Sequence, residues 1–276
     1  MAVTSFIPEI WNAQLLTDFR EQAVAAALTN REYEGNASSG NVVKINTAVA
    51  VQVKDYKANS RTTSADSVST TSQDLLIDQE KNFDFYVDDI DKAQAAGSMD
   101  AFTRSAGEGM AEDSDKFILS TAVTGAGTAL DSGGVALDDP EAAFNAIRDM
   151  RKALRKALVP GGQWVLLVNA EFEAVLLGAS SKLTSVDTSG SPAGLRNASL
   201  GRLLNFDIYS TENLPTTAKA QAVALYRPSL AYVSQVEKTE ALRAQDKFAD
   251  RLRGLHVYGG KVIRPEGIVT WTDTSA

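Results

Sequence analysis

Cysteine is absent from this chain of 276 residues, and histidine occurs once, as His256. Without cysteine the chain can form no disulfide, no thiolate metal site and no cysteine nucleophile. A catalytic triad that needs an imidazole would have to use His256, yet no Gly-x-Ser-x-Gly motif supplies a nucleophile for it. We therefore interpret His256 as a packed or half-exposed strand histidine and expect the chain not to be an enzyme.

Long apolar runs and an excess of basic charge are also missing. No apolar stretch approaches the ~20 residues of a membrane span, so we expect no membrane contact. Residues 1–5 lack the basic flank and apolar stretch of a signal peptide. The 35 acidic side chains outnumber the 27 basic ones, which gives a net charge of −8. Such a chain can enclose nucleic acid without adhering to it, because tight binding needs clustered Lys and Arg.

Two further patterns could bind a ligand, and each lacks an essential part. Asp88, Asp89 and Asp91 could hold a hard cation loosely, but they lack the glycine turn and downstream glutamate of a calcium loop. The glycine-rich run 125–134 lacks the Lys-Ser/Thr pair of a phosphate-binding loop, so we interpret it as a turn-rich link. We expect no metal ion and no cofactor.

The most informative feature present is a pair of long alternating stretches, Val42–Lys54 and Leu75–Asp88. Period-two alternation predicts strands with one apolar face, and both stretches exceed the usual ~5–6 residues of a strand. The Ser/Thr-rich tract 59–73 between them predicts a polar tip. Because an isolated hairpin is marginally stable, we expect an antiparallel hairpin whose apolar face is covered by another copy of the chain. The contact candidates on that face are Val49, Val51, Val53, Phe83 and Phe85.

Residues 1–40 have the pattern of an arm. Trp11, Leu15 and Phe19 recur at a spacing of four, and Ala23 and Ala27 continue the stripe. This predicts an amphipathic helix of about four to five turns. The stripe could pack within the chain or against a neighbouring subunit, and the sequence leaves both alternatives open.

The rest of the chain predicts an α/β arrangement. We expect a long helix over about 98–122 and a second helix from the N-cap Asp139 to about Leu158, with Leu154 and Leu158 on its buried stripe. The opposite face of the second helix is basic, includes Arg151 and Arg155, and is either solvated or in contact with acidic groups of a neighbour. A continuous apolar run predicts a strand buried on both faces at 164–168, and Asn169 after it is expected to cap a short helix that runs through Leu177. Further strands are expected at about 203–210, 220–226, 232–243, 252–263 and 267–272.

The order of these parts resembles the major capsid (coat) proteins of tailed bacteriophages, whose fold is shared with herpesvirus capsids and encapsulins. The resemblance covers nearly the whole chain and is carried by FIPEIW from Phe6, VKINT from Val43, GRLLNFDIYS from Gly201 and HVYGGKV from His256. It implies an α+β fold with an N-terminal arm at 1–40 and an extended hairpin loop at 41–91. A peripheral domain would comprise the long helix and the closing strands, 92–130 and 228–276, with an inserted α/β axial subdomain at 131–227.

The resemblance implies a protein that self-assembles into hexamers and pentamers of an icosahedral shell around the double-stranded DNA of a tailed phage. It would act in the virion after assembly in the host cytoplasm. Its partners would be other copies of itself, a separate scaffolding protein, a portal protein and a decoration protein, and it would enclose DNA without sequence-specific binding. Since the arm begins within ten residues of Met1, we expect no cleaved scaffolding segment.

A second departure from some family members concerns an extra inserted domain. No segment is long enough for an extra inserted domain. Family members that cross-link their shells need a lysine on the extended loop, and Lys54 and Lys57 lie there, but the sequence identifies no partner asparagine.

The alternative functions are an encapsulin-type compartment holding a cargo protein, a tail-tube or fibre protein, and an α/β enzyme using His256 or the Asp88 cluster.

Overall fold

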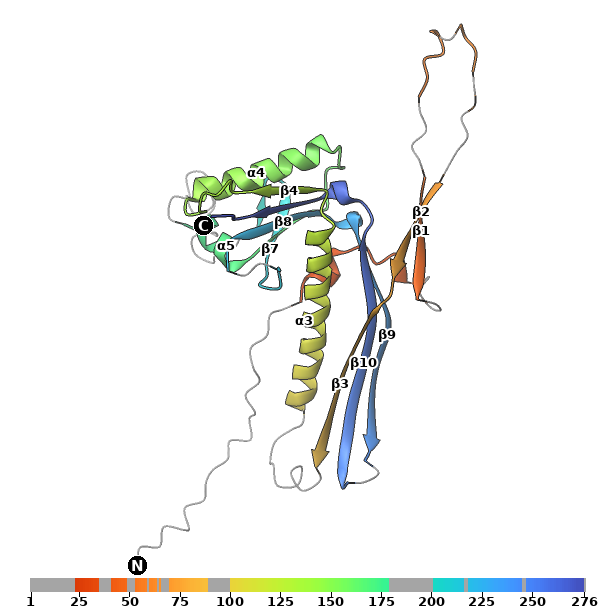
Figure 1. Ribbon diagram of the computed structural model, residues 1–276, viewed down its shortest axis with the longest axis vertical. Helices are drawn as coiled ribbons and strands as arrows, with labels where there is room; N and C mark the ends of the chain where they lie inside the picture. The colour runs from red at the N-terminus through yellow and green to blue at the C-terminus, as the bar shows by residue number, and fades with distance from the viewer. Residues whose placement is uncertain are drawn as a thin grey trace, which may run out of the picture.

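A computed structural model describes residues 23–34, 41–48, 53–58, 60–63, 65, 70–88, 100–178, 201–215, 218–244 and 247–275. The described strands form a six-stranded sheet, a three-stranded sheet and a two-stranded hairpin (Figure 1). The six-stranded sheet has helices on both faces. The three-stranded sheet runs beside the long helix α3 (Asp100–Thr124). In Figure 1 both extend downward from the six-stranded sheet, whereas the hairpin projects upward.

The six-stranded sheet has the order β4-β11-β8-β5-β7-β6. Its bounds are β4 Thr128–Asp131, β5 Trp164–Val168, β6 Arg202–Leu203, β7 Phe206–Ser210, β8 Gln221–Tyr226 and β11 Ile268–Thr272. All five residues of β5 are buried, which confirms the prediction of a strand covered on both faces. The expected strand 203–210 is interrupted, because Leu204 and Asn205 adopt positive φ values of 47° and 72° and turn the chain from β6 into β7.

Two helices cover one face of this sheet. Asp139 caps α4 (Pro140–Lys156) by accepting a hydrogen bond from the Glu141 amide, and Asn169 caps α5 (Ala170–Leu176) in the same way. Both caps were predicted. The core beneath them contains Ile147, Met150, Leu154, Trp164, Phe172, Phe206 and Trp271. The other face packs against α3 and α1 (Ala25–Leu28), and Ile118, Leu119 and Ala122 of α3 are buried there.

The three-stranded sheet has the order β3-β10-β9, with β3 at Gln79–Asp88, β10 at Ala249–Val262 and β9 at Leu230–Arg243. The α3 helix lies along one of its faces, where Phe117 meets Tyr258 edge to face with ring centroids 5.4 Å apart. Two short 3₁₀ turns, η2 (Arg227–Ser229) and η3 (Pro265–Gly267), join this sheet to the larger one.

The hairpin pairs β1 (Val42–Ala48) with β2 (Thr70–Leu76) in antiparallel register. Alternation along β1 is as predicted, since Val43 and Ile45 are buried while Lys44 and Asn46 are exposed. The base of the hairpin docks on the three-stranded sheet so closely that a Cβ at Gly259 would lie 2.1 Å from the Leu76 carbonyl oxygen. A side chain there would push the hairpin off the sheet.

The predicted hairpin was wrong in its second strand and in what covers its base. The stretch Leu75–Asp88 divides after Leu76, and its longer part, β3, pairs with β10 instead of Val42–Lys54. The true second strand begins at Thr70, inside the tract assigned to the tip. The apolar base is buried by the same chain, against Ala231, Val233 and Ile263, so a neighbour is not needed to cover it. Both errors arise because alternation gives the face of a strand but not its partner.

Four smaller expectations also need correction. The glycine-rich run 125–134 contains β4, which pairs in parallel with β11. Strand β11 itself joins the six-stranded sheet, although the sequence grouped it with the closing strands of the long-helix domain. Leu158, expected on the buried stripe of α4, is 87% exposed, and Val159 is buried in its place. In α1 the buried residues are Ala25 and Leu28, whereas Ala27 is exposed.

Candidate subunit-contact surfaces

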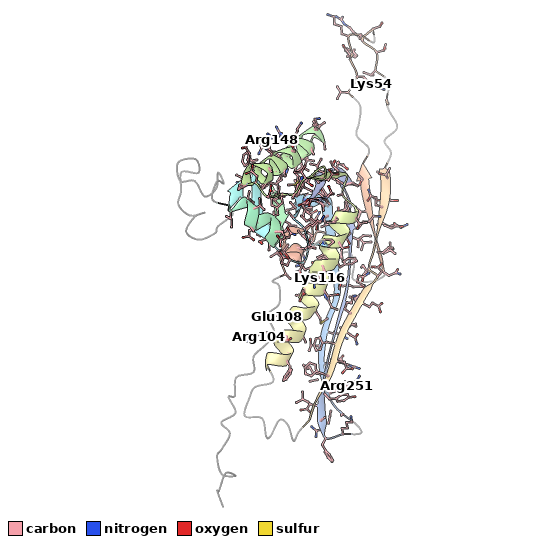
Figure 2. All side chains as sticks on the ribbon, turned by 60° about the vertical axis from the view of Figure 1, so that its left-hand side comes forward. Lys54, Arg104, Glu108, Lys116, Arg148 and Arg251 are labelled. Atoms are coloured by element: carbon pink, nitrogen blue, oxygen red, sulfur yellow. The ribbon has the colours of Figure 1, made fainter. Side chains whose placement is uncertain are left out.

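Five of the ten predicted contact residues lie outside the described residues: Trp11, Leu15, Phe19, Val49 and Val51. Their role therefore stays a prediction. Of the others, Val53 is 100% exposed near the far end of the hairpin. Figure 2 shows its neighbour Lys54 at that far end, well away from the two sheets.

The described part of the hairpin tip has a local turn with an exposed aromatic side chain. The Asp55 carboxylate accepts hydrogen bonds from the amides of Lys57 and Ala58 at 2.9 and 3.2 Å. Tyr56, within that turn, is 55% exposed. Sequence reasoning passed over Tyr56 because it lies between the predicted strand, which ends at Lys54, and the predicted tip 59–73. An aromatic residue beside a polar tip is itself a signal of contact.

Phe83 and Phe85 face their own chain. Their rings stack with centroids 6.1 Å apart, and Phe85 lies 6.3 Å from Phe102 of α3. The Phe83 ring covers Gly254, where a Cβ would lie only 2.2 Å from a ring carbon. Both side chains are half-buried, so only their uncovered parts are free to meet another subunit.

The far end of the three-stranded sheet has exposed apolar side chains within a network of charges. Tyr86, Leu242 and Phe248 are 51%, 43% and 81% exposed. Arg251 forms a bidentate ion pair with Asp84 and lies 5.5 Å from the Tyr86 ring centroid. The hydrogen bond from Arg251 holds the pKa of Asp84 below its usual range. No periodic signal in the sequence marked these residues, because Tyr86 falls on the polar face of its alternating stretch and Leu242 and Phe248 each adjoin a charged side chain.

A buried carboxylate holds the described part of the N-terminal arm, residues 23–34, which we call the arm root. Asp115 of α3 is fully buried and accepts hydrogen bonds from the amides of Val24 and Ala25, at 3.0 and 2.5 Å. It also accepts one at 3.0 Å from the side-chain amide of Asn213, which follows β7. Burial raises the pKa of Asp115, and the hydrogen bonds oppose that rise. Asp115 thus caps α1 from another helix and ties the arm root to α3 and to the segment that follows β7.

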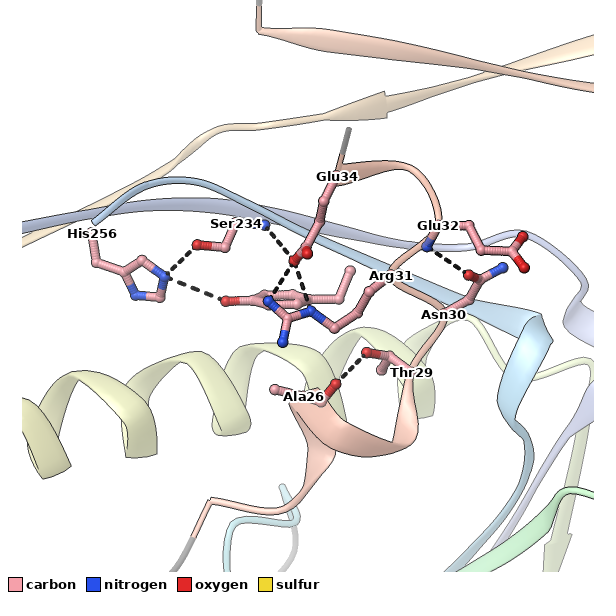
Figure 3. A network of polar contacts seen from close by, with 9 residues as sticks. Ala26, Thr29, Asn30, Arg31, Glu32, Glu34, Ser234 and His256 are labelled. Carbon is pink, nitrogen blue, oxygen red and sulfur yellow. Dashed lines mark hydrogen bonds and ion pairs between the residues drawn. The ribbon is translucent and has the colours of Figure 1, made fainter. Parts of the chain in front are cut away.

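The arm root is also paired to the edge of β9. The Asn30 amide donates to the Leu230 carbonyl at 2.8 Å, and Asn30 accepts in return from the Tyr232 amide at 3.1 Å. Figure 3 shows the next contacts, in which Arg31 bonds to Glu34 and the Glu34 carboxylate accepts from the Ser234 amide. These hydrogen bonds hold the arm root in a fixed orientation along the edge of β9.

His256 is a packed strand histidine, as predicted. It is 8% exposed, and its Nε2 atom lies 3.1 Å from the Ser234 hydroxyl and 3.4 Å from the Tyr232 hydroxyl. Its ring packs 4.7 Å from that of Tyr258. Within the described ranges no group of three or more His, Asp or Glu side chains is placed to hold a metal ion.

On α4 the two predicted basic residues have different surroundings. Arg151 donates to the Leu204 carbonyl and lies 5.8 Å from the Trp164 ring centroid, so it is engaged within the chain. Arg155 is exposed, together with Arg148, Lys152 and Lys156. None of the described helices is both long and apolar enough to cross a membrane.

Comparison with known proteins gives consistent matches over most of the chain. A family model described as phage capsid protein matches residues 70–271. A solved chain from Mycobacterium phage Che8 is 52% identical, with 98% of each chain covered and a TM-score of 0.89. The capsid structure of the cyanophage P-SCSP1u is 12% identical with a TM-score of 0.82, covering 100% of this chain and 95% of that one. A virus-like particle from Pyrococcus furiosus is 16% identical with a TM-score of 0.54, covering 84% and 86%. Among curated proteins no match was found.

Proposed function

The chain belongs to the phage capsid protein family, and on that basis we propose that it builds the hexamers and pentamers of an icosahedral shell around double-stranded DNA. It is a structural subunit of the virion capsid. The observation that carries the finer proposal is the projecting hairpin. Its base is fixed in its own chain, while its far end stands clear of both sheets (Figure 1).

A projection of this kind suits contact with another copy. Val53 and Tyr56 are exposed at the far end, and Val42 and Leu76 are 38% and 53% exposed where the hairpin leaves the body. Apolar side chains on the hairpin that are not covered by their own chain favour burial between subunits. We therefore keep Val49, Val51 and Val53 as contact residues, together with Trp11, Leu15 and Phe19 of the arm.

Repetition makes moderate contacts sufficient. Each ~1.4 kcal/mol gained by one set of contacts multiplies an association constant about tenfold. In a closed shell every subunit gains that contribution, so individually weak interfaces add to a stable particle. We propose that the hairpin, the arm, the exposed part of Phe83 and Phe85, and Arg155 each contribute one such interface, whereas Arg151 acts within its own chain.

Other partners belong to the proposal as well. A separate scaffolding protein, a portal protein and a decoration protein would complete the particle, and assembly would take place in the host cytoplasm. The net charge of −8 suits an inner wall that encloses DNA without retaining it. An encapsulin-type compartment is less favoured, because the match at 52% identity is to a phage chain.

The contents of the particle test the proposal. Particles purified from infected cells and treated with nuclease should retain double-stranded DNA of genome length. Recovery of a protein cargo in place of DNA would support the encapsulin-type alternative.

Hydrogen exchange tests the role of the hairpin. Amides at the far end of the hairpin, around Val53 to Tyr56, should gain protection when free subunits assemble. Those of β5 should be protected in both states and serve as the internal control, since β5 is fully buried. Equal exchange at the hairpin end before and after assembly would show that a neighbour does not bind there.

A further inference from the structure

The two ends of α4 have opposite charge and each lies beside an exposed apolar side chain. Asp138 and Glu141 are exposed at the start of the helix, next to Val135, which is 69% exposed. Lys152, Arg155 and Lys156 are exposed near its end, next to Leu158, which is 87% exposed. We propose that these ends bind each other head to tail in successive copies of the chain. The proposal rests on the assembly function above and names one of its interfaces.

The two surfaces cannot meet within one subunit. A helix of 17 residues is about 25 Å long, so its ends stay that far apart. Figure 1 shows α4 lying over one face of the six-stranded sheet, and Figure 2 shows Arg148 pointing outward from the helix. In the described part of the chain no acidic side chain pairs with Lys152, Arg155 or Lys156. The partner with fitting charge is the acidic end of a second copy.

Leu158 gives an independent reason to expect a contact. The Leu158 amide donates to the Arg155 carbonyl, and the Val159 amide donates to the Leu154 carbonyl, at 3.1 Å each. This is the hydrogen-bond pattern of a Schellman motif, with Leu158 in the left-handed position at φ 58°. Glycine is the usual residue there, because a Cβ is strained at positive φ. A leucine that is strained and exposed adds nothing to the fold of one subunit, so we assign its value to the interface.

The helix dipole explains only part of the pattern. Acidic residues in the first turn and basic residues in the last turn stabilise an isolated helix. That effect does not require Lys152, Val135 or Leu158 to be exposed. A head-to-tail contact uses two different surfaces, so it can repeat around a ring when its rotation closes, as hexamers and pentamers require. Opposite charges at the two surfaces would fix the direction of the ring and exclude head-to-head contacts.

The variant Leu158→Gly separates folding from assembly. Relief of the left-handed strain should leave the Tm unchanged or raise it by about 2–4 °C. The yield of sedimenting shells should fall at least tenfold, because the apolar contact is lost. The matched control is Leu255→Gly, because Leu255 is exposed on the three-stranded sheet, away from α4. This substitution should lower the Tm without a tenfold loss of shells. Full assembly of Leu158→Gly would overturn the proposal.

Charge exchange tests the direction of the contact. Asp138→Lys with Glu141→Lys should block shells, and so should Lys152→Glu with Lys156→Glu. All four substitutions together should restore them, although they oppose the helix dipole at both ends. If the fourfold variant does not fold, mixing the two double variants tests the same contact by association alone. Alternating copies would pair unlike ends in a ring of six, although not in a ring of five. Failure of the folded fourfold variant, or of the mixture, to associate refutes the contact. If the wild-type chain forms no shells, the proposed function itself fails.

Discussion

Replacing Leu154 with aspartate should unfold the six-stranded sheet, whereas replacing its neighbour Arg155 with glutamate should leave the fold intact. Leu154 is fully buried in the core between α4 and the sheet, in a cluster with Ile147, Met150 and Trp164. Arg155, one position further, is exposed. The two substitutions therefore place the same type of charge at a buried and at an exposed position of one helix turn.

The magnitudes follow from burial. Loss of a buried leucine side chain costs about 2–3 kcal/mol, and an unpaired carboxylate in an apolar core costs several kcal/mol more. The sum, about 5 kcal/mol or more, is comparable with the whole stability of a typical domain. Arg155→Glu should cost about 1 kcal/mol or less, because it alters an exposed side chain near the helix C-terminus. It should instead weaken shell assembly.

Urea unfolding followed by tryptophan fluorescence measures both effects. Two of the three tryptophans, Trp164 and Trp271, lie in the core that contains Leu154, so the signal reports on that core. Leu154→Ala serves as a control of intermediate cost, about 2–5 kcal/mol. Equal destabilisation by Leu154→Asp and Arg155→Glu would refute the assignment of faces on α4.

Three further predictions follow from the described contacts. Asp115→Asn should destabilise the chain by about 1–3 kcal/mol in urea unfolding, because its new amide group faces the side-chain amide of Asn213. Adding Asn213→Asp should recover most of that loss of stability, and no recovery would refute the pairing. Gly107→Ala in α3 should stabilise the chain by about 1 kcal/mol, since a Cβ there has open space, whereas Gly259→Ala should destabilise it by displacing the hairpin base; thermal unfolding that ranks them in reverse would contradict this. Because the pKa of Asp84 is lowered in the folded chain, its contribution to stability is present above the ordinary aspartate pKa and is lost as the pH falls through the lowered value. The Tm of Asp84→Asn should therefore decline less between pH 5 and pH 2.5 than that of the wild type. Parallel curves would count against the Arg251 ion pair.

Local signals in the sequence predicted those elements well whose formation depends on a few adjacent residues or on one continuous pattern. Asp139 and Asn169 were correctly identified as caps, because a cap depends on a few adjacent residues. The buried strand β5 was clear from its unbroken apolar run. The resemblance to phage coat proteins was confirmed by the family match over residues 70–271.

Pairing between distant segments was less accessible. The alternation of residues 75–88 is real, but nothing local indicates that β3 pairs with β10, some 170 positions further along the chain. The environment of Leu158 was also missed, since its spacing continues the buried stripe of α4 while the helix ends two residues earlier. Among the contact candidates, the sequence could not show that Arg151 bonds to the Leu204 carbonyl, because that contact depends on the turn between β6 and β7.

Imaging of the purified chain by electron microscopy tests the central claim most directly. We expect closed shells of uniform size, with six-fold and five-fold clusters of subunits visible in class averages. A second copy should cover the projecting hairpin of each subunit in the reconstructed density. Particles that remain single 29.5 kDa subunits at every concentration, or that form only unbranched fibres, would contradict the account.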